Sequence, residues 1–382
     1  MIDTLFFFSL SIGVLYLSIF SFASLKRVSP PNSRTIVGEP KIVVLFPAYR
    51  EDGVIEFSVA SFLEQNYPKK LYEVVVISDS MLDKTNKILS NLPITLLVAP
   101  TPLKNKGNAL KYALDKLGER EFNMAIVLDA DNTVEPNFLN DISLSYCGGA
   151  AAIQVHRKAK NSESPYAILD GISEEINNSI FRLGHSNLGL SATLSGSGMA
   201  FDYTLFKKLV PHLKSAGEDK ELELLLLQEG VKVEYLNNTP LYDQKIASSG
   251  SFYNQRRRWI ASQLNALKEG WKLLPKALKE RNIDLSNKIF HHLLLPKVLL
   301  FGLLLLFATA TLAISPLCSI KWWLATALFV VAMVVATPRE MLNREAVKSF
   351  VKLPAIFLMM LFNLFRSRGA VEHFIHTKKG EV

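Results

Sequence analysis

Long uncharged runs near the two ends constrain this chain most, because each is long enough to cross a membrane. Thr4 to Leu25 gives 22 residues without a charge, Val298 to Ile320 gives 23, and Trp322 to Pro338 gives 17. A helix rises about 1.5 Å per residue and the apolar core of a bilayer is about 30 Å thick, so about 20 such residues span it. The sequence therefore predicts a transmembrane helix in residues 1–27 and a transmembrane hairpin in residues 291–338.

The first run could instead be a signal peptide, but two features argue against that reading. Asp3 stands where a basic segment is expected, and no small-residue cleavage site precedes Lys26 and Arg27. These two cations predict that the chain after them is cytoplasmic and that the N-terminus faces outward. We therefore expect an integral membrane protein of a bacterial-type plasma membrane, with its central domain in the cytoplasm.

The C-terminal runs are expected to form a tight hairpin and then a shorter segment. Trp322 and Trp323 would lie at the membrane interface, and Arg344 would return to the cytoplasmic side. Leu353 to Phe365 has only 13 uncharged residues, which favours an interfacial or re-entrant helix. Residues 339–382 would then be cytoplasmic or interfacial. The cations that would otherwise face outward are Arg366, Arg368, Lys378 and Lys379.

Between the membrane segments, residues 40–290 alternate strand-like and helix-like patterns. This alternation predicts an α/β domain with a mostly parallel sheet covered on both faces and ligands at the carboxyl ends of the strands. The expected strands are Lys41 to Phe46, Glu73 to Ser78, Ile94 to Val98 and Met124 to Leu128, and the expected helices are Val54 to Gln65, Lys84 to Leu92 and Asn108 to Leu117.

Charge and cysteine content exclude several function classes. The net charge of +8 is largely explained by Lys and Arg beside the membrane runs, and no nucleic-acid recognition module is evident. Cys147 and Cys318 are the chain's two cysteines, and their separation indicates neither a disulfide framework nor a zinc site.

An Asp-Ala-Asp triplet, Asp129 to Asp131, follows the buried run that ends at Leu128. Period-two geometry would place both carboxylates on the same side at the end of a strand. Carboxylate oxygens suit Mg²⁺ or Mn²⁺, which can share their ligand shell with phosphate oxygens. The alternative is a solvated Asp-rich turn, since a triplet of this kind is a weak signal alone.

Polar residues follow the other predicted strands and would line the same crevice. Pro47-Ala48-Tyr49-Arg50-Glu51 follows the first strand, Asp79 follows the second, and Lys106 begins a helix. Tyr49 could stack on a base, Asp79 could accept a hydrogen bond from a uracil N–H, and Lys106 could approach a phosphate. Each has a structural alternative: Tyr49 could pack, Asp79 could cap the next helix, and Lys106 could be solvated.

Two later segments offer further candidate site residues. Glu218 and Asp219 precede a helical run, so Asp219 could point from a first turn or N-cap into a cleft. Gln255, Arg258 and Trp259 share one helical face by their i, i+3, i+4 spacing. A guanidinium can bind a diphosphate bidentately, and an indole can stack on a sugar ring. The alternative is a basic amphipathic helix on anionic lipid.

In this order the motifs resemble the membrane-embedded family-two β-glycosyltransferases, which include cellulose, chitin and hyaluronan synthases and ceramide glucosyltransferases. The resemblance runs from about Lys41 to Trp259 and extends to the flanking spans. The matching segments are Pro47-Ala48-Tyr49, Asp79, Lys106-Gly107, Asp129-Ala130-Asp131, Gly196-Ser197-Gly198, Glu218-Asp219 and Gln255-Arg256-Arg257-Arg258-Trp259.

The resemblance implies a GT-A fold, a nucleotide-sugar donor that is usually UDP-linked, and Mg²⁺ or Mn²⁺ as cofactor. It makes Asp219 the catalytic base beside Glu218 and places Asp131 and Asp129 at the metal. The implied donor-binding residues are Pro47, Ala48, Tyr49, Glu51, Asp79, Lys106, Asp129, Gln255 and Arg258. The implied acceptor-binding residues are Gly196, Ser197, Gly198 and Trp259.

The expected reaction is inverting sugar transfer to a membrane-associated polysaccharide or oligosaccharide, because one base in the acceptor cleft would give a β-linkage from an α-linked donor. The chain departs from the polymerising synthases in offering only three crossings and one interfacial helix. The alternatives are transfer of one sugar to a lipid, polyprenyl or ceramide-like, and a membrane scaffold without activity. The sugar, the linkage position and any partner subunit are left open.

Overall fold

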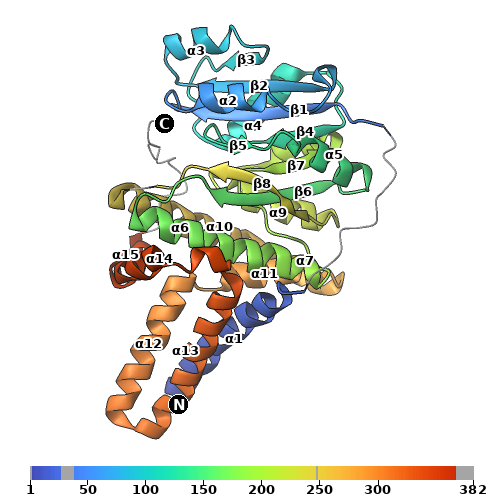
Figure 1. Cartoon of the computed structure of the whole chain (residues 1–382). Coiled ribbons are helices and arrows are strands. Elements are labelled where there is room, and N and C mark those ends of the chain that lie inside the picture. The colour runs from blue at the N-terminus through green and yellow to red at the C-terminus, as the bar shows by residue number, and fades with distance from the viewer. Residues whose placement is uncertain (1, 27–37, 247, 367–382) are drawn as a thin grey trace.

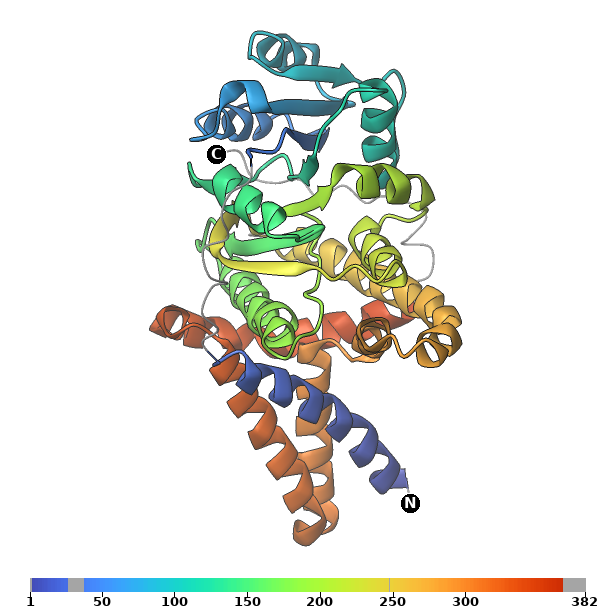
Figure 2. The same ribbon diagram turned by 90° about the vertical axis from the view of Figure 1, so that its right-hand side faces the viewer.

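The computed structural model describes residues 2–26, 38–246 and 248–366. An α/β body lies at one end, and long helices extend from it at the other (Figure 1, Figure 2). Arg27, Arg368, Lys378 and Lys379, which entered the predicted topology, lie outside the described residues.

The body is built on one eight-stranded sheet with the strand order β3-β2-β1-β4-β7-β6-β8-β5. The β1–β2, β2–β3, β1–β4 and β6–β8 pairs are parallel, and the other three neighbouring pairs are antiparallel. The mostly parallel α/β class is therefore confirmed. The strands are β1 (Ile42–Tyr49), β2 (Tyr72–Asp79), β3 (Thr95–Val98), β4 (Met124–Val127), β5 (Thr133–Val134), β6 (Ala152–Ala159), β7 (Met199–Asp202) and β8 (Glu234–Asp243).

Helices cover both faces of this sheet, and local capping fixes where several begin (Figure 1). The Asn105 side chain accepts the N–H of Asn108 at 2.8 Å and so starts α4, while Ser164 caps α6 ahead of Pro165. The helices of the body are α2 (Ile55–Phe62), α3 (Asp83–Leu89), α4 (Lys106–Leu117), α5 (Phe138–Cys147), α6 (Pro165–Asn177), α7 (His185–Asn187), α8 (Tyr203–Leu209) and α9 (Glu218–Gln228), with the short helices η1 (Lys69–Leu71), η2 (Asn178–Gly184, a π-helix) and η3 (Val210–His212).

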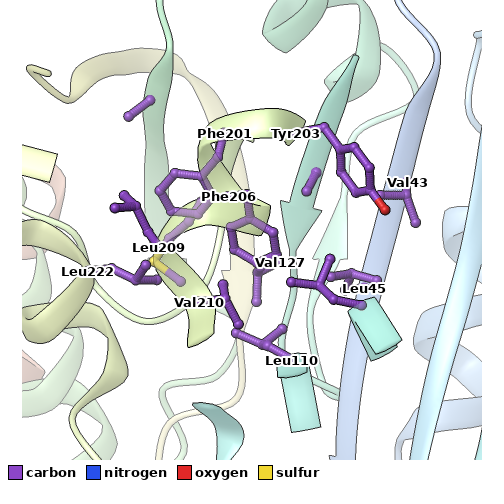
Figure 3. Close-up of a cluster of buried hydrophobic side chains, with 14 of the residues drawn as sticks. Val43, Leu45, Leu110, Val127, Phe201, Tyr203, Phe206, Leu209, Val210 and Leu222 are labelled. Atoms are coloured by element: carbon purple, nitrogen blue, oxygen red, sulfur yellow. The ribbon is translucent and has the colours of Figure 1, made fainter. Parts of the chain in front are cut away.

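The sheet separates two hydrophobic cores because successive strand residues point to opposite faces. In β1, Val43 and Leu45 face one core, and Val44 and Phe46 face the other. Figure 3 shows the first core, in which Val43 and Leu45 belong to one cluster with Val127 of β4 and Phe206 of α8. This two-sided burial explains why the strands read as continuous apolar runs rather than as alternating ones.

Two helices, α10 (Ser249–Lys279) and α11 (Ile283–Leu293), lie between the body and the long apolar helices (Figure 1). Among the described residues, four helical segments are long and apolar enough to cross a membrane. Three are α1 (Ile2–Ala23), α12 (Lys297–Ile314) and α13 (Pro316–Ala336), which pack together. The fourth segment, Arg344–Leu364, follows η4 (Arg339–Met341) and combines α14 (Arg344–Ser349), η5 (Phe350–Lys352) and most of α15 (Leu353–Arg366).

The arrangement of α15 bears on the segment expected to be interfacial. Helix α15 contacts α10 and α12. It lies close to the body, across the hairpin formed by α12 and α13, whereas those two helices extend away from the body (Figure 1, Figure 2). The crossing or interfacial position of Leu353 to Phe365 remains a prediction.

The hairpin turn lies earlier than the uncharged runs predicted. Helix α12 ends at Ile314 and α13 starts at Pro316, because proline cannot continue a helix but fits its first turn. Trp322 is therefore inside α13 and fully buried, stacked on Phe307 with ring centroids 4.6 Å apart. The short link therefore lies at Ser315 and not at Lys321, between the two uncharged runs. The interfacial position of Trp322 and Trp323 remains a prediction.

Candidate functional site

One large cavity of about 870 Å³ begins at the carboxyl ends of β1 and β2. It passes the starts of α9 and α10 and continues between α6, α12 and α13. Among the predicted site residues, Asp131, Ser197 and Gly198 do not line it. Those that do are Pro47, Ala48, Tyr49, Glu51, Asp79, Lys106, Asp129, Gly196, Glu218, Asp219, Gln255, Arg258 and Trp259.

At the first two strand ends, Tyr49 and Asp79 are direct neighbours in the parallel register. Asp79 is buried, and its carboxylate accepts the N–H of Leu103 at 3.0 Å and the hydroxyl of Ser80 at 2.9 Å. It does not cap α3, whose N-cap is Leu82. Asp79 is thus held in place by the loop before α4, at the cavity wall.

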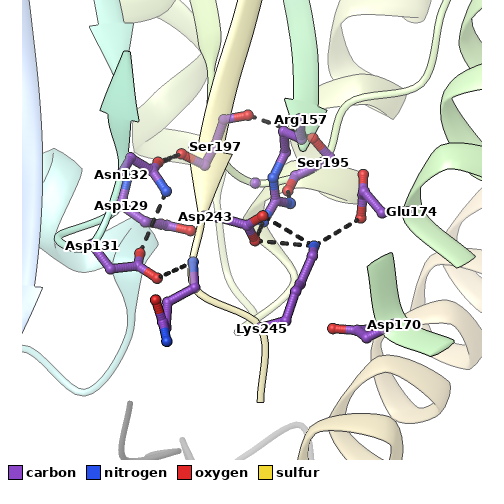
Figure 4. A network of polar contacts seen from close by, with 12 residues as sticks. Asp129, Asp131, Asn132, Arg157, Asp170, Glu174, Ser195, Ser197, Asp243 and Lys245 are labelled. Carbon is purple, nitrogen blue, oxygen red and sulfur yellow. Dashed lines mark hydrogen bonds and ion pairs between the residues drawn. The ribbon is translucent and has the colours of Figure 1, made fainter. Parts of the chain in front are cut away.

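Asp129 begins a turn directly after β4. Its N–H donates to Asn132 Oδ1 at 2.8 Å and to Ser197 Oγ at 2.9 Å, and its carbonyl accepts the N–H of Asn132 at 3.1 Å. Asp131 is only 2% exposed and accepts the N–H of Gln244 at 3.1 Å (Figure 4). The strand ends before this turn, so the turn and not period-two strand geometry positions the two carboxylates; Asp129 lines the cavity and Asp131 does not.

Lys106, the first residue of α4, reaches across the cavity wall to three groups. Its ammonium lies 2.5 Å from Asp129 Oδ1, 2.6 Å from the Gly196 carbonyl and 3.9 Å from Glu218 Oε1. The solvated alternative for Lys106 is thereby excluded. The lysine links the end of β4 to the start of α9.

Glu218 and Asp219 occupy the first turn of α9, after Gly217 as N-cap. A Cβ on Gly217 would lie 2.0 Å from Ser262 Oγ, so glycine permits α9 to start against α10. Burial raises the pKa of Glu218 to about 7, with Lys106 lowering it and Asp219 raising it. A carboxyl with this pKa can be either protonated or ionised near neutral pH.

The Gly196-Ser197-Gly198 segment divides between the cavity and its support. Gly196 faces the acidic pair, since a Cβ there would lie 3.8 Å from Glu218 Oε1 and 3.9 Å from Asp219 Oδ2. Ser197 is fully buried and hydrogen-bonds Asn132 instead. A Cβ on Gly198 would lie 2.5 Å from Val155. Ser197 and Gly198 therefore lie outside the cavity lining, and Ser197 stabilises the turn at Asp129 through its hydrogen bonds.

On α10, Gln255, Arg258 and Trp259 all line the cavity, as do Arg256 and Ile260 from outside the predicted face. The Gln255 Oε1 atom is buried without a hydrogen-bond partner among the described residues. Burial lowers the pKa of Arg258, while Glu218, Asp129, Asp219 and Glu51 act in the opposite direction. A guanidinium and an amide with an unpartnered oxygen thus lie at the same wall as the carboxylates.

Arg256, in the same basic run, has a different setting. Its guanidinium pairs with Asp170 of α6 and lies over the rings of Trp259 and Phe252, at 4.3 and 4.6 Å from their centroids. Arg256 thus ties α10 to α6 and supports the Trp259 indole.

Sequence reasoning missed a buried ionic network deeper in the cavity (Figure 4). Arg157 Nη2 lies 2.6 Å from Asp243 Oδ2, and Lys245 Nζ lies 3.0 Å from Asp243 Oδ1 and 3.8 Å from Glu174. Asp243 is the last residue of β8, and Arg157 lies near the end of β6. The search for polar residues at strand ends could have found both, had these two strands been predicted.

The described residues contain no group of three or more His, Cys, Asp or Glu side chains arranged to hold a metal ion. Two carboxylates near one turn, Asp129 and Asp131, still offer the hard oxygen donors that Mg²⁺ or Mn²⁺ takes, with room for ligands from a substrate. The residue types fit such an ion.

Comparison with known proteins identifies relatives of this chain. The probable glycosyltransferase YdaM of Bacillus subtilis is 23% identical over 385 residues, covering 94% of this chain and 89% of the relative. An N-acetylglucosaminyltransferase of Sinorhizobium fredii is 24% identical, and the match covers 71% of this chain and 69% of that relative. A beta-monoglucosyldiacylglycerol synthase of Synechocystis is 21% identical, covering 70% of this chain and 58% of its own.

The mannosyltransferase PcManGT of Pyrobaculum calidifontis, solved in complex with GDP-Man and Mn²⁺, has a similar structure. Its TM-score is 0.58 at 16% identity, and the match covers 94% of this chain and 99% of that one. This likeness confirms the predicted GT-A-like fold. The sequence profile described as "Glycosyl transferase family group 2" matches residues 125–337, more than half of the chain. The predicted membership is thus confirmed: the chain belongs to glycosyl transferase family group 2.

Proposed function

We propose that this protein is an inverting glycosyltransferase that moves a sugar from a UDP-linked donor to a hydroxyl of a membrane-associated acceptor. One observation carries the proposal. Asp79, Asp129, Asp219, Arg258 and Trp259 come from separate places in the chain, and all line one cavity. A scaffold without activity would have no need to keep these groups together.

The donor would lie at the ends of β1, β2 and β4. Tyr49 would stack on the base and Asp79 would accept a uracil N–H, since the two lie side by side. Pro47, Ala48 and Glu51 complete this part of the wall.

The diphosphate would lie against the cations and amide beyond the base. Arg258 can bind two phosphate oxygens in its planar fork. Lys106 lies at the Asp129 turn, and Gln255 offers its side-chain amide to the same region. Their shared position at this wall supports a diphosphate site.

Asp131 and Asp129 would hold Mg²⁺ or Mn²⁺. The donor part of the cavity is lined by five carboxylates and four cations. A bound diphosphate would add negative charge to this region, which has no excess of positive charge to neutralise it. These groups are Glu51, Asp79, Asp129, Glu218 and Asp219, and Lys104, Lys106, Lys220 and Arg258. When bound, the metal would supply Lewis-acid neutralisation of the diphosphate.

Asp219 is proposed as the general base. It would accept the proton of the acceptor hydroxyl as that oxygen forms a bond to the anomeric carbon. The bond from the anomeric carbon to the diphosphate oxygen breaks, and nucleoside diphosphate leaves beside Arg258. Attack from the opposite face converts an α-linked donor into a β-linked product.

A saccharide acceptor would lie against Trp259 and Gly196, between the acidic pair and α10. The resemblance favours polysaccharide or oligosaccharide acceptors. A second candidate, a lipid acceptor, is favoured by the continuation of the cavity between α6, α12 and α13, whose walls there are largely apolar. One relative is named as a synthase of a glucosylated diacylglycerol, which agrees with that candidate.

The experiment is to incubate purified protein in lipid with a panel of radiolabelled nucleotide sugars and to size the products. We expect one donor to be consumed, nucleoside diphosphate to be released, and label to enter lipid or saccharide. A ladder of products would indicate a polymerising enzyme, and one product a single addition. If no nucleotide sugar in the panel were consumed, the proposal would be contradicted. The Asp219→Asn variant serves as the blank.

A further inference from the structure

The deep part of the cavity contains buried cations that are mostly paired. Arg157 and Lys245 contact Asp243 at 2.6 and 3.0 Å, and Arg182 contacts Glu174 at 2.9 Å. The neighbouring cations hold the pKa of both carboxyls below their usual range, against the effect of burial, so both are ionised at neutral pH. This part of the wall therefore has three positive and two negative charges.

Arg256 and Lys297 also line this wall. Arg256 pairs with Asp170 and is neutralised by it. Lys297, where α12 begins, differs: among the described residues no carboxylate lies within ion-pair distance of it. Its ammonium donates to Asn177 Oδ1 and lies 5.7 Å from the centre of the Phe181 ring. Five basic side chains thus face three carboxylates, and Lys297 is the one of the five without a carboxylate partner among the described residues.

The cavity changes character just beyond Lys297. Its wall there is formed by Phe301 of α12, Phe329 and Met333 of α13, and Ile356 of α15. These helices belong to the segments long and apolar enough to cross a membrane. A ligand that filled this space would be anionic beside Lys297 and apolar beyond it.

From this juxtaposition we propose that the acceptor is a lipid whose headgroup carries a phosphate beside the accepting hydroxyl, with that phosphate bound by Lys297. A compact ammonium on a cavity wall suits a phosphate, and no protein carboxylate competes for it. This proposal rests on the proposed function and names its acceptor class. A neutral diacylglycerol or a long saccharide would leave Lys297 without an anionic partner.

The transfer step balances without another reactant. The lipid hydroxyl loses its proton to Asp219 and bonds to the anomeric carbon, while the donor's sugar–diphosphate bond breaks. The lipid phosphate is not altered. Its contact with Lys297 positions the lipid so that the hydroxyl reaches Asp219 and the acyl chains lie between α12, α13 and α15.

The test compares two acceptors that differ in the phosphate. Phosphatidylcholine vesicles would carry either phosphatidylglycerol, which has a phosphate and free hydroxyls, or diacylglycerol, which has a hydroxyl alone. We expect transfer to phosphatidylglycerol. Lys297→Met should raise its KM about tenfold or more with a smaller change in kcat, because a charge-assisted contact is lost. Lys297→Arg should keep a low KM.

Two controls separate the phosphate contact from other effects. Lys348 is exposed on α14 and pairs with Glu345, so Lys348→Met removes a nearby cation without touching the cavity. It should leave the KM unchanged. The Kd for UDP should be equal in wild type and Lys297→Met, and thermal unfolding checks that both fold. A UDP affinity that fell with Lys297→Met would assign this lysine to the donor and overturn the proposal.

The remaining outcomes distinguish this inference from the proposed function. Transfer to diacylglycerol or to an oligosaccharide alone, with no effect of Lys297→Met, would overturn the phosphate-bearing acceptor and leave the glycosyltransferase intact. Failure to consume any donor, even by slow hydrolysis, would contradict the proposed function itself.

Discussion

The Lys106 ammonium lies 2.5 Å from Asp129 Oδ1, and its next carboxylate, Glu218 Oε1, is 3.9 Å away. One lysine therefore connects the turn after β4 with the first turn of α9. It lowers the pKa of Glu218, which burial raises to about 7. The proposed donor site and the proposed base are thus coupled through a single side chain.

The first prediction concerns the pH dependence of kcat/KM. Ionised Glu218 keeps negative charge beside Asp219 and makes it a better proton acceptor. Since the Glu218 pKa is raised, the rate should be full above about pH 7 and should fall as the pH drops through that value. Lys106→Met removes a group that lowers this pKa, so the midpoint should move to higher pH. Initial rates measured across the pH range give this midpoint for the wild type and for Lys106→Met.

Glu218→Gln is the control for this assignment. The acidic limb near pH 7 should disappear in that variant, because the titrating carboxyl is gone. Lys106→Met is also expected to bind donor more weakly, so the midpoint and not the absolute rate is compared. An identical limb in wild type and Glu218→Gln would show that another group titrates.

The fold was predictable from sequence because its signals are local. The four predicted strands all form, with ends that differ from β1 to β4 by at most a few residues. Gln255, Arg258 and Trp259, which the i, i+3, i+4 spacing placed together, all line the cavity. Helical periodicity depends only on neighbours within one element, so it can be read from the chain.

The parts that were missed depend on contacts between distant segments. The Asp131 carboxylate turns to the N–H of Gln244, a residue 113 positions away, and this contact left no local pattern. The pairing of Arg157 with Asp243 likewise joins β6 to β8. The hairpin turn at Pro316 was a local signal and could have been read.

The second prediction concerns the metal. Asp131→Asn should lower transfer about 10²–10³-fold, because a hard anionic ligand is lost and the departing diphosphate is less well neutralised. EDTA should abolish wild-type activity, and Mg²⁺ or Mn²⁺ should restore it. Asp115→Asn, on the exposed side of α4, is the matched control and should change little. Wild-type protein that remains fully active in EDTA would refute the metal role.

The third prediction concerns the acceptor. Trp259→Ala should raise the KM for acceptor about tenfold while the Kd for UDP stays constant, because the stacking surface is lost. Trp259→Phe should retain most of the acceptor affinity. Arg256 lies 4.3 Å from the Trp259 ring, so thermal unfolding of both variants is needed to exclude a loss of stability. A change in UDP affinity equal to the change in KM would assign Trp259 to the donor instead.

The fourth prediction concerns topology. The proposed parts are a transmembrane helix (1–27), a cytoplasmic domain (40–290), a transmembrane hairpin (291–338) and a cytoplasmic or interfacial C-terminal segment (339–382). Cys318 is exposed in the first turn of α13, so it should react with an impermeant thiol reagent added to intact cells. Cys147, at the end of α5 in the body, should react only after lysis. Cys318→Ser and Cys147→Ser variants assign the labelling. Labelling of Cys147 in intact cells would invert the proposed orientation.

The central claim is that Asp219 takes the proton of the acceptor, and one paired measurement tests it. Asp219→Asn should bind UDP with wild-type affinity in a calorimetric titration and should transfer sugar about 10²–10⁴-fold more slowly, since only the base is lost. Asp79→Ala, at the proposed base-binding end of the cavity, should instead lose UDP affinity. An Asp219→Asn protein that transfers sugar at close to the wild-type rate would contradict the mechanism.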